Sequence, residues 1–405
     1  MLINLGDNTV TDKPLSDLRV IEVGQLLAGP FASTILGYFG AEVIKIEQPE
    51  KGDPIRGWRH VVDGTSLWWS SLARNKRCIT LNISKKEGQQ ILANLLKKSD
   101  ILIENFKPGV MEKWGFSNSS VEKISKKIIY ARISGYGQTG PYAGKAGFAS
   151  VCEAFGGLRF VNGVPGEPPV RPNLSIGDTL AGIHAALGIL LAIIQRQKDG
   201  SGQVIDVAIF ESIFNLLEAV VPEYSGAGII RQPSGTTITG IVPTNTYLCA
   251  DNVHIVIGAN TNPMFKRLAQ LIGRDDMSSD PELEENTGRV KHQKKVDFAI
   301  EEWTKQIDSK TALSKLDAAS IAAGPIFSVE DMFNDEQYEH RELLETVSIN
   351  GKNLRIPAII PKLSRTPGRT AHPGASLGEY NQEIYKNLLN ISPDELKELE
   401  EKKII

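Results

Sequence analysis

The sequence predicts an α/β protein whose parallel sheet is covered by helices on both faces. Near the N-terminus an apolar strand over 18–24 is followed by a helical segment over 31–39, and a second strand over 41–47 follows Gly40. Strands and helices then keep alternating along the chain. Parallel strands require crossover connections, usually helices, which pack on both faces of the sheet. This alternation therefore favours a parallel sheet between two helical layers.

The later elements continue the alternation as far as the middle of the chain. Further strands are expected over 77–83, 101–104, 128–134 and 204–208, and further helices over 85–98, 120–127, 179–197 and 210–220. A charged helix is expected over 392–403, where an acidic start and a lysine end suit the helix dipole.

The length of 405 residues favours two domains. The stretch 222–240 contains six Gly or Pro residues and is typical of a linker. We therefore expect a large domain over 1–221, a linker over 222–242 and a small domain of mixed strands and helices over 243–324. The pattern that begins at Gly324 predicts a further α/β segment over 325–405.

Composition and charge exclude several classes of function. The 45 basic and 48 acidic side chains give a net charge of −3, which argues against a general nucleic-acid or membrane-surface binder. Cys78, Cys152 and Cys249 are far apart, so neither a disulfide framework nor a metal site is expected. The N-terminus lacks a signal-peptide pattern, and the longest apolar run, 181–194, is too short to span a bilayer. We expect a cytoplasmic protein, or one of an organelle matrix if the source is eukaryotic.

Three local patterns each have two interpretations. The first strand–helix turn, 24–30, lacks G-x-G-x-x-G, which disfavours a nicotinamide or flavin dehydrogenase. The basic run 74–77 complements the phosphates of a ligand such as CoA, or is a solvated loop. Asn105 and Phe106 follow a strand end, where they bind a ligand or form an Asn turn with a buried ring.

The stretch Asn173–Thr179 precedes the longest predicted helix and carries the most information. Ser175 or Asp178 is placed to cap this helix, with Asp178 the expected cap. The same position favours an ionised carboxylate, which can attack an activated carbonyl, and Gly177 leaves room for a substrate. His184 is more typical of a packed helix residue than of a catalytic base. No G-x-S-x-G occurs, which disfavours a serine hydrolase.

Several stretches resemble, in order and spacing, the class III (CaiB/BaiF) CoA-transferase family, which includes formyl-CoA:oxalate CoA-transferases. The resemblance covers nearly the whole chain. The residues that carry it are 15–23, Leu27-Ala-Gly-Pro30, 40–47, Asn75-Lys-Arg77, 104–109, 134–141, Gly177-Asp178 and Gly202-Gln203.

The resemblance implies roles for individual residues. Asp178 matches the catalytic aspartate. Positions that line the CoA site match Leu27, Ala28, Gln48, Leu81, Asn105, Phe106, Lys113 and Lys145. Some members have Arg in place of Gln48, and Phe148 and Ala149 replace a frequent aromatic–acid pair. Glu153 stands near a frequent Gln, and the mobile glycine-rich loop of the oxalate enzymes has no close copy.

The resemblance also implies the fold and the reaction. Such proteins have a Rossmann-like large domain built from both chain ends, a smaller α+β domain, and an interlocked homodimer. The implied reaction moves CoA from an acyl-CoA donor such as succinyl-CoA to a small carboxylic acid, through an aspartyl-CoA thioester on Asp178. No tightly bound cofactor is implied, since CoA is a substrate. N–H groups near 24–28 and at Thr179 are expected to stabilise the oxyanion.

Two other functions remain open on the sequence. An acyl-CoA racemase or isomerase of the same fold needs a proton-transfer pair, for which His184 is the available histidine. A non-catalytic CoA-binding protein is the second alternative. Arg159 and Arg171 either pair with a distal substrate carboxylate or are ordinary surface residues.

Overall fold

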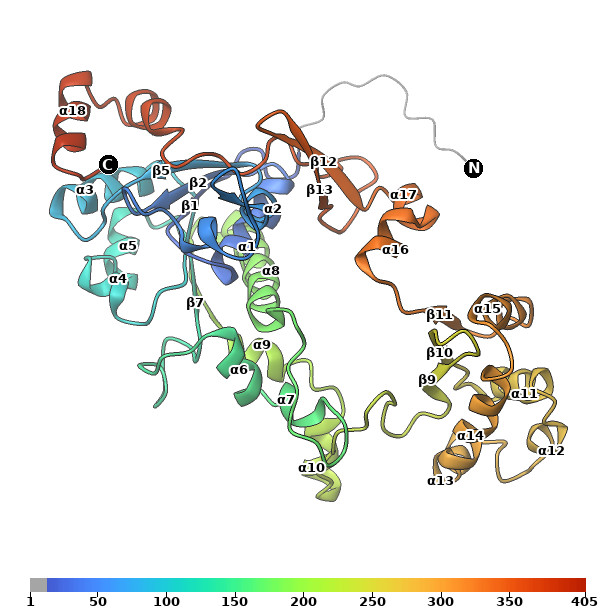
Figure 1. The fold of residues 1–405 in the computed structure, drawn as a ribbon. Coiled ribbons are helices and arrows are strands. Elements are labelled where there is room, and N and C mark those ends of the chain that lie inside the picture. Colours follow the sequence, from blue (N-terminus) through green and yellow to red (C-terminus); the bar gives the residue numbers. More distant parts are fainter. Residues whose placement is uncertain (1–12) are drawn as a thin grey trace. The chain divides into compact units, whose positions relative to one another are not determined.

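A computed structural model describes residues 13–405, and these divide into two compact units (Figure 1). The first, here the sheet unit, comprises the described part of Met1–Leu158 together with Pro172–Glu218 and Glu339–Ile405. The second, here the small unit, comprises Arg159–Arg171 and Ala219–Tyr338. The C-terminal segment thus belongs to the same unit as the N-terminal half.

The sheet unit is built on six parallel strands, which confirms the predicted α/β class. In spatial order the strands are β5 (Lys76–Thr80), β2 (Glu42–Glu47), β1 (Arg19–Glu22), β6 (Ile101–Glu104), β7 (Ile129–Ser134) and β8 (Val204–Ala208). Every neighbouring pair in this order is parallel. The carboxyl ends of all six strands therefore meet at one edge of the sheet.

The strand order reverses direction beside β1. From β1 the chain passes to β2 and then β5 on one side, and it returns to β6 on the other side of β1. The connections that leave the carboxyl ends of β1 and β6 consequently run apart. In open α/β sheets a crevice at such a switch point is the usual place for a ligand.

Helices cover both faces of the sheet and bury separate apolar clusters. On one face, α3 (Lys86–Leu96) contributes Leu92 and Leu95 and α18 (Pro393–Glu401) contributes Leu399. On the other, α1 (Ala28–Tyr38) and α8 (Ile176–Asp199) contribute Leu36 and Ile189. The first cluster includes the C-terminal helix, so the two ends of the chain share one core.

Helix α8 has 24 residues, and by length and composition it is apolar enough to cross a membrane. The apolar run read from the sequence is shorter than this helix, so the length argument made above was wrong. The helix instead packs against α1 and β7 inside the sheet unit. A Cβ at Gly182 would lie 2.8 Å from the carbonyl oxygen of Ala28, so the two helices approach closely. Helix α8 is a core helix of the sheet unit.

The remaining elements of the sheet unit are short. They are η1 (Pro54–Gly57), β3 (Val61–Val62), β4 (Thr65–Ser66), α2 (Leu67–Leu72), α4 (Val110–Lys113), α5 (Asn118–Ile124), α6 (Ala149–Phe155), α9 (Ile209–Phe214), β12 (Leu344–Ile349), β13 (Lys352–Pro357) and the π-helical η2 (Glu383–Leu388). Strands β3 and β4, like β12 and β13, form a two-stranded antiparallel ladder.

The small unit holds a three-stranded antiparallel sheet with helices around its own core. Its strands are β9 (Thr244–Leu248), β10 (His254–Gly258) and β11 (Ala323–Pro325), in the order β11-β10-β9. Its helices are α10 (Val220–Ala227), α11 (Asn262–Leu271), α12 (Asp275–Ser278), α13 (Asn286–Lys291), α14 (Gln293–Thr304), α15 (Ser309–Ala318) and α16 (Val329–Asn334). Helices α7 (Leu158–Val161) and α17 (Glu336–His340) each span a limit between the units. The limits 222–242 and 243–324 expected for a linker and small domain stay predictions.

Candidate functional site

The loop that leaves β1 is held in place by side chains from two other loops. The N–H of Gln25 donates to Oδ1 of Asn105 at 2.8 Å, and Nδ2 of Asn105 donates to the Gln25 carbonyl at 2.8 Å. The N–H of Leu26 donates to Oδ1 of Asp53 at 3.1 Å. Leu26 has a φ of 62°, a left-handed conformation that side chains other than Gly, Asn and Asp rarely adopt. Asn105 and Asp53 therefore hold this loop in place, although the left-handed backbone conformation of Leu26 is unfavourable.

Asp53 belongs to a buried network of ion pairs with Lys45, Glu22 and Lys76. Nζ of Lys45 lies 2.8 Å from Oδ2 of Asp53 and 2.7 Å from Oε1 of Glu22, and Nζ of Lys76 lies 2.9 Å from Oε2 of Glu22. Burial opposes the ionisation of Glu22, but the two ammonium groups outweigh it and lower its pKa to about 2. The carboxylates that surround Lys45 likewise outweigh burial and raise its pKa. Burial lowers the pKa of Lys76, and Glu22 beside it opposes that effect. Glu22 and Lys45 are therefore charged, and Lys45 positions Asp53.

Helix α8 begins at Ile176, two residues before Asp178, so the prediction that Asp178 caps the helix was wrong. Ser175 is the N-cap residue, but its side chain makes no capping hydrogen bond. Instead the N–H of Gly177 donates to Oε1 of Glu153 on α6, at 3.1 Å. Glu153 is fully buried and 24 residues away in the chain. Asp178 lies inside the first turn, half-buried, where the positive end of the helix dipole favours a carboxylate.

A cavity of about 330 Å³ lies at the switch point, and we call it the Asp178 cavity. Its walls come from the loops after β1 and β6, from the end of β7, from residues 145–148 and from the first turn of α8. Six of the nine residues predicted for the site line it: Leu27, Ala28, Asn105, Phe106, Lys145 and Asp178. The reversal of strand order thus brings together residues that are up to 151 positions apart.

The other three predicted residues do not line this cavity. Gln48 is exposed and directly follows β2, and Leu81 directly follows β5 with 1% of its surface exposed. Both lie at the carboxyl edge of the sheet that also carries the cavity. Lys113 is exposed at the end of α4. Their assignment to a CoA site stays a prediction.

The basic run 74–77 is not a solvated loop, because two of its three cations are buried and the third, Arg77, pairs with Glu42 and Glu383. Its interpretation as a phosphate site stays a prediction. Arg74 is buried and donates to the carbonyl oxygens of Ser71 and Pro357 at 2.6 and 2.7 Å. Lys76 is buried against Glu22. Burial of these charges is possible because carboxylates and carbonyls from distant segments surround them, which a local sequence pattern does not reveal.

Two other side chains near the site are not poised for catalysis. Burial, together with the charges of Asp178 and Glu153, raises the pKa of the Cys152 thiol to about 11, so the thiol is protonated at neutral pH. His184 does not line the Asp178 cavity but a separate hollow beside Asp206 and Glu211. Over residues 13–405 no group of three or more His, Cys, Asp or Glu side chains is arranged to hold a metal ion.

Sequence reasoning missed two features of the site. Glu153 was noted without a role, since its partner Gly177 is distant in the chain. Ser134, the last residue of β7, lines the Asp178 cavity, and its buried hydroxyl has no hydrogen-bond partner among the described residues. A strand-end position is the signal that points to Ser134, but it applies equally to five other strands.

Comparison with known proteins gives one consistent result. Residues 15–381 match the sequence profile described as CoA-transferase family III. The chain is 41% identical to the succinyl-CoA–D-citramalate CoA-transferase of Chloroflexus aurantiacus, over 97% of this chain and 98% of the relative. It is 39% identical to the alpha subunit of a succinyl-CoA–L-malate CoA-transferase from that organism, over 97% and 92%. A formyl-CoA:oxalate CoA-transferase of Streptomyces coelicolor is 32% identical over 98% and 100%.

A solved structure has the same fold. A CaiB/BaiF family protein from Brucella suis superimposes with a TM-score of 0.82 at 30% identity, covering 93% of this chain and 100% of that chain.

Proposed function

This chain belongs to CoA-transferase family III, and on that premise we propose that it moves CoA from a donor such as succinyl-CoA to a small carboxylic acid through a thioester on Asp178. The supporting observation is the position of Asp178. It is the carboxylate that lines the cavity at the switch point, and it lies in the first turn of a long helix. The names of the relatives point to succinate, malate or citramalate as acids of the right class.

The reaction proceeds by two displacements at each half-transfer. A carboxylate oxygen of Asp178 attacks the thioester carbonyl carbon, the C–S bond breaks, and CoA leaves as the thiolate. The thiolate attacks the Asp178 carbonyl carbon of the resulting anhydride, and the donor acid leaves as its carboxylate. The acceptor carboxylate then displaces CoA from the aspartyl thioester, and the thiolate attacks the acceptor acyl carbon. Asp178 is regenerated as a carboxylate, and no net proton is consumed.

The anhydride intermediates need N–H donors to stabilise each oxyanion. The N–H of Thr179 donates to the Ser175 carbonyl at 3.1 Å, which argues against its expected role as a donor. Those of Gln25 and Leu26 are also used inside the protein. Ala28 is the first residue of α1, where N–H groups have no acceptor within the helix, so the N–H of Ala28 is our proposed donor. The ring of Phe106 and the ammonium of Lys145 are proposed to contact CoA.

The alternative functions have less support. A racemase needs a base at the acyl α-carbon, and His184 lies two turns along α8 from Asp178, about 9 Å by helical rise. His184 lines the separate hollow beside Asp206 and Glu211, not the Asp178 cavity. A binding protein without activity would not need an acid in the Asp178 cavity. We keep the transferase as the proposed function.

We also propose a cytoplasmic, interlocked homodimer. Helix α8 leaves large apolar side chains exposed, among them Ile183, Leu187 and Leu191 at 44%, 52% and 58%. Strand β8 beside it is an edge strand of the sheet. Such a surface suits a second copy of this chain. A solution mass equal to that of one 44.3 kDa chain would contradict the dimer.

Replacement of the proposed nucleophile tests the function. Asp178→Asn keeps the size of the side chain but removes the attacking oxygen anion. We expect transfer from succinyl-CoA to a dicarboxylate to fall at least about 10³-fold, because the covalent route is lost. The matched control is Asp199→Asn, at the exposed opposite end of the same helix, which should stay within about twofold of wild type. Equal activity of Asp178→Asn and wild type would overturn the proposal.

A further inference from the structure

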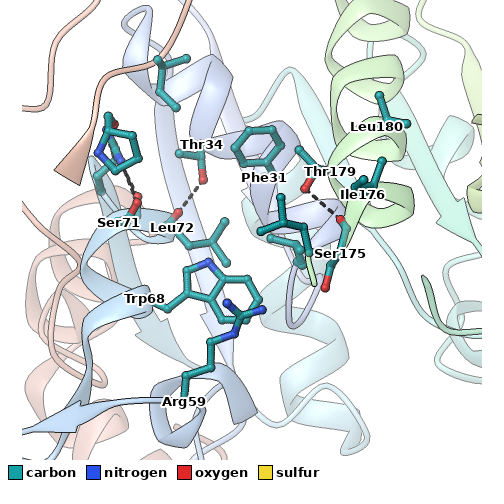
Figure 2. Close-up of a pocket in the computed structure, with 15 residues that line it drawn as sticks. Phe31, Thr34, Arg59, Trp68, Ser71, Leu72, Ser175, Ile176, Thr179 and Leu180 are labelled. Atoms are coloured by element: carbon teal, nitrogen blue, oxygen red, sulfur yellow. Dashed lines mark hydrogen bonds between the residues drawn. The ribbon is translucent and has the colours of Figure 1, made fainter. Parts of the chain in front are cut away.

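A second cavity of about 370 Å³ lies against the same first turn of helix α8, and we call it the Trp68 cavity (Figure 2). Ser175, Ile176 and Thr179 line it, whereas Asp178 lines the Asp178 cavity. Leu27 lines both cavities. Leu27 is therefore a wall shared by the two cavities, and both cavities lie against the first turn of α8 that carries Asp178.

Most of the Trp68 cavity is apolar, with walls that include Phe31, Leu72, Leu180 and Ile359. Such walls suit the methylene groups of an acyl chain and exclude water from it. Water exclusion matters here because an acyl anhydride or aspartyl thioester is lost to hydrolysis if water reaches it.

Two arginines line the Trp68 cavity, and they differ in what they contact. The Arg74 guanidinium is used within the protein, in hydrogen bonds to Ser71 and Pro357 and an ion pair with Glu345. Arg59 is exposed, and over the part of the chain that the structure describes it has neither an ion-pair partner nor a side-chain hydrogen bond. Arg59 is therefore the cation of this cavity that can accept an anionic ligand.

The Arg59 guanidinium is held in place by an aromatic ring. Its central carbon lies 4.2 Å from the centre of the Trp68 ring, and Figure 2 shows the two side chains against each other. A stacked guanidinium keeps its N–H edges open for a carboxylate, which it can bind through two parallel hydrogen bonds. The ring therefore orients Arg59 without using its donors.

The backbone at Arg59 adopts a conformation that arginine does not favour. Its φ is 59°, in the left-handed region, and it precedes the β3–β4 ladder, which is closed by a hydrogen bond from Leu67 N–H to the His60 carbonyl at 3.0 Å. Residues kept in this region cost free energy and concentrate at ligand sites. This backbone conformation places the Arg59 side chain against the Trp68 ring.

We propose that the Trp68 cavity holds the acyl chain and that Arg59, stacked on Trp68, binds the distal carboxylate of a dicarboxylic acyl group. The inference rests on the proposed function, because it names the substrate class of that same site. One carboxyl of a dicarboxylic acid reacts with Asp178, and the other remains an anion that needs a cation at the far end of an apolar chain. Arg59 is thereby a specificity-determining residue.

The test compares dicarboxylate with monocarboxylate acceptors of equal chain length, such as succinate and butyrate. Arg59→Met keeps the length of the side chain and removes its charge and donors. We expect kcat/KM for succinate to fall about 10- to 100-fold, mainly through KM, while kcat/KM for butyrate stays within about twofold. Arg59→Lys should recover part of the loss, since it restores charge but not the two parallel hydrogen bonds.

The control is Arg341→Met, which removes an exposed arginine that lines neither cavity. An equal fall for succinate and butyrate, or no fall for succinate, would overturn the role of Arg59. If wild type transfers CoA and Asp178→Asn does not, either of these two results removes the role of Arg59 and leaves the proposed function intact. If wild type transfers CoA to no acid, both fail.

Discussion

At the scale of single residues, the site depends on charges that serve different purposes. Asp178 is half-buried beside a cavity, where a carboxylate can meet a substrate. Glu22 is fully buried between Lys45 and Lys76, and it never meets solvent. Glu22 pairs with Lys45, and Lys45 pairs with Asp53. Asp53 in turn accepts the hydrogen bond from the N–H of Leu26. Stability and site geometry therefore share one ion network.

The pH dependence of stability tests this network. The folded-state pKa of Glu22 is about 2, below its ordinary value of 4.5, so its contribution is present above about pH 4.5 and is lost as pH falls toward 2. Glu22→Gln leaves the buried ammonium group of Lys76 without a carboxylate, and it leaves Lys45 with Asp53. We expect it to lower the free energy of unfolding at pH 7 by about 3–5 kcal/mol.

Denaturant unfolding of wild type and Glu22→Gln between pH 2 and 7 measures both effects. Wild type should lose stability more steeply than the variant between pH 4.5 and 2. Glu122→Gln, on the exposed face of α5, is the control and should follow wild type. If Glu22→Gln and the control had the same free energy of unfolding at every pH, the ion network would make no contribution to stability.

The sequence predicted which residues line the Asp178 cavity better than it predicted their local environment. Asp178 was identified as a nucleophile through the resemblance, yet its expected role as helix cap was wrong. Helix α8 starts earlier because buried Glu153, which is distant in the chain, accepts the hydrogen bond from Gly177. Arg59 had no signal at all, since its contact with Trp68 depends on how the β3–β4 ladder folds back.

At the scale of elements, helix α8 carries Asp178, the proposed nucleophile, and α1 packs against this helix. The predicted helix 179–197 and the observed Ile176–Asp199 agree closely, because the apolar pattern is long and continuous. What the pattern did not show is how closely the two helices approach. That contact depends on Gly182, where the Cβ of any other residue would lie 3.1 Å from Cβ of Phe31 and nearer still to the Ala28 carbonyl oxygen.

Gly182→Ala tests the helix contact. The added methyl group must push α8 away from α1, so we expect a loss of about 1–3 kcal/mol in the free energy of unfolding and a lower kcat. Gly226→Ala is the control, because a Cβ at Gly226 in α10 meets no atom within 4 Å. Helix propensity predicts that this control is neutral or stabilising by up to about 1 kcal/mol. Thermal or denaturant unfolding decides, and a Gly182→Ala protein as stable and active as wild type would contradict the contact.

At the scale of the whole molecule, the alternation of strands and helices was sufficient to predict a parallel sheet. It was not sufficient to predict the strand order, which depends on which side of β1 the chain returns to. That order creates the crevice between the loops after β1 and β6 and so the Asp178 cavity. The resemblance supplied what the pattern lacked, namely that distant stretches of the chain form one site.

The central claim is that CoA becomes attached to Asp178 during transfer. The most direct measurement is the mass of the wild-type protein after incubation with succinyl-CoA without an acceptor, followed by peptide mapping. We predict an increase equal to CoA minus water, located on the peptide that contains Asp178 and removed by hydroxylamine, which labels Asp178 alone. No adduct, or an adduct on another residue, would contradict the account.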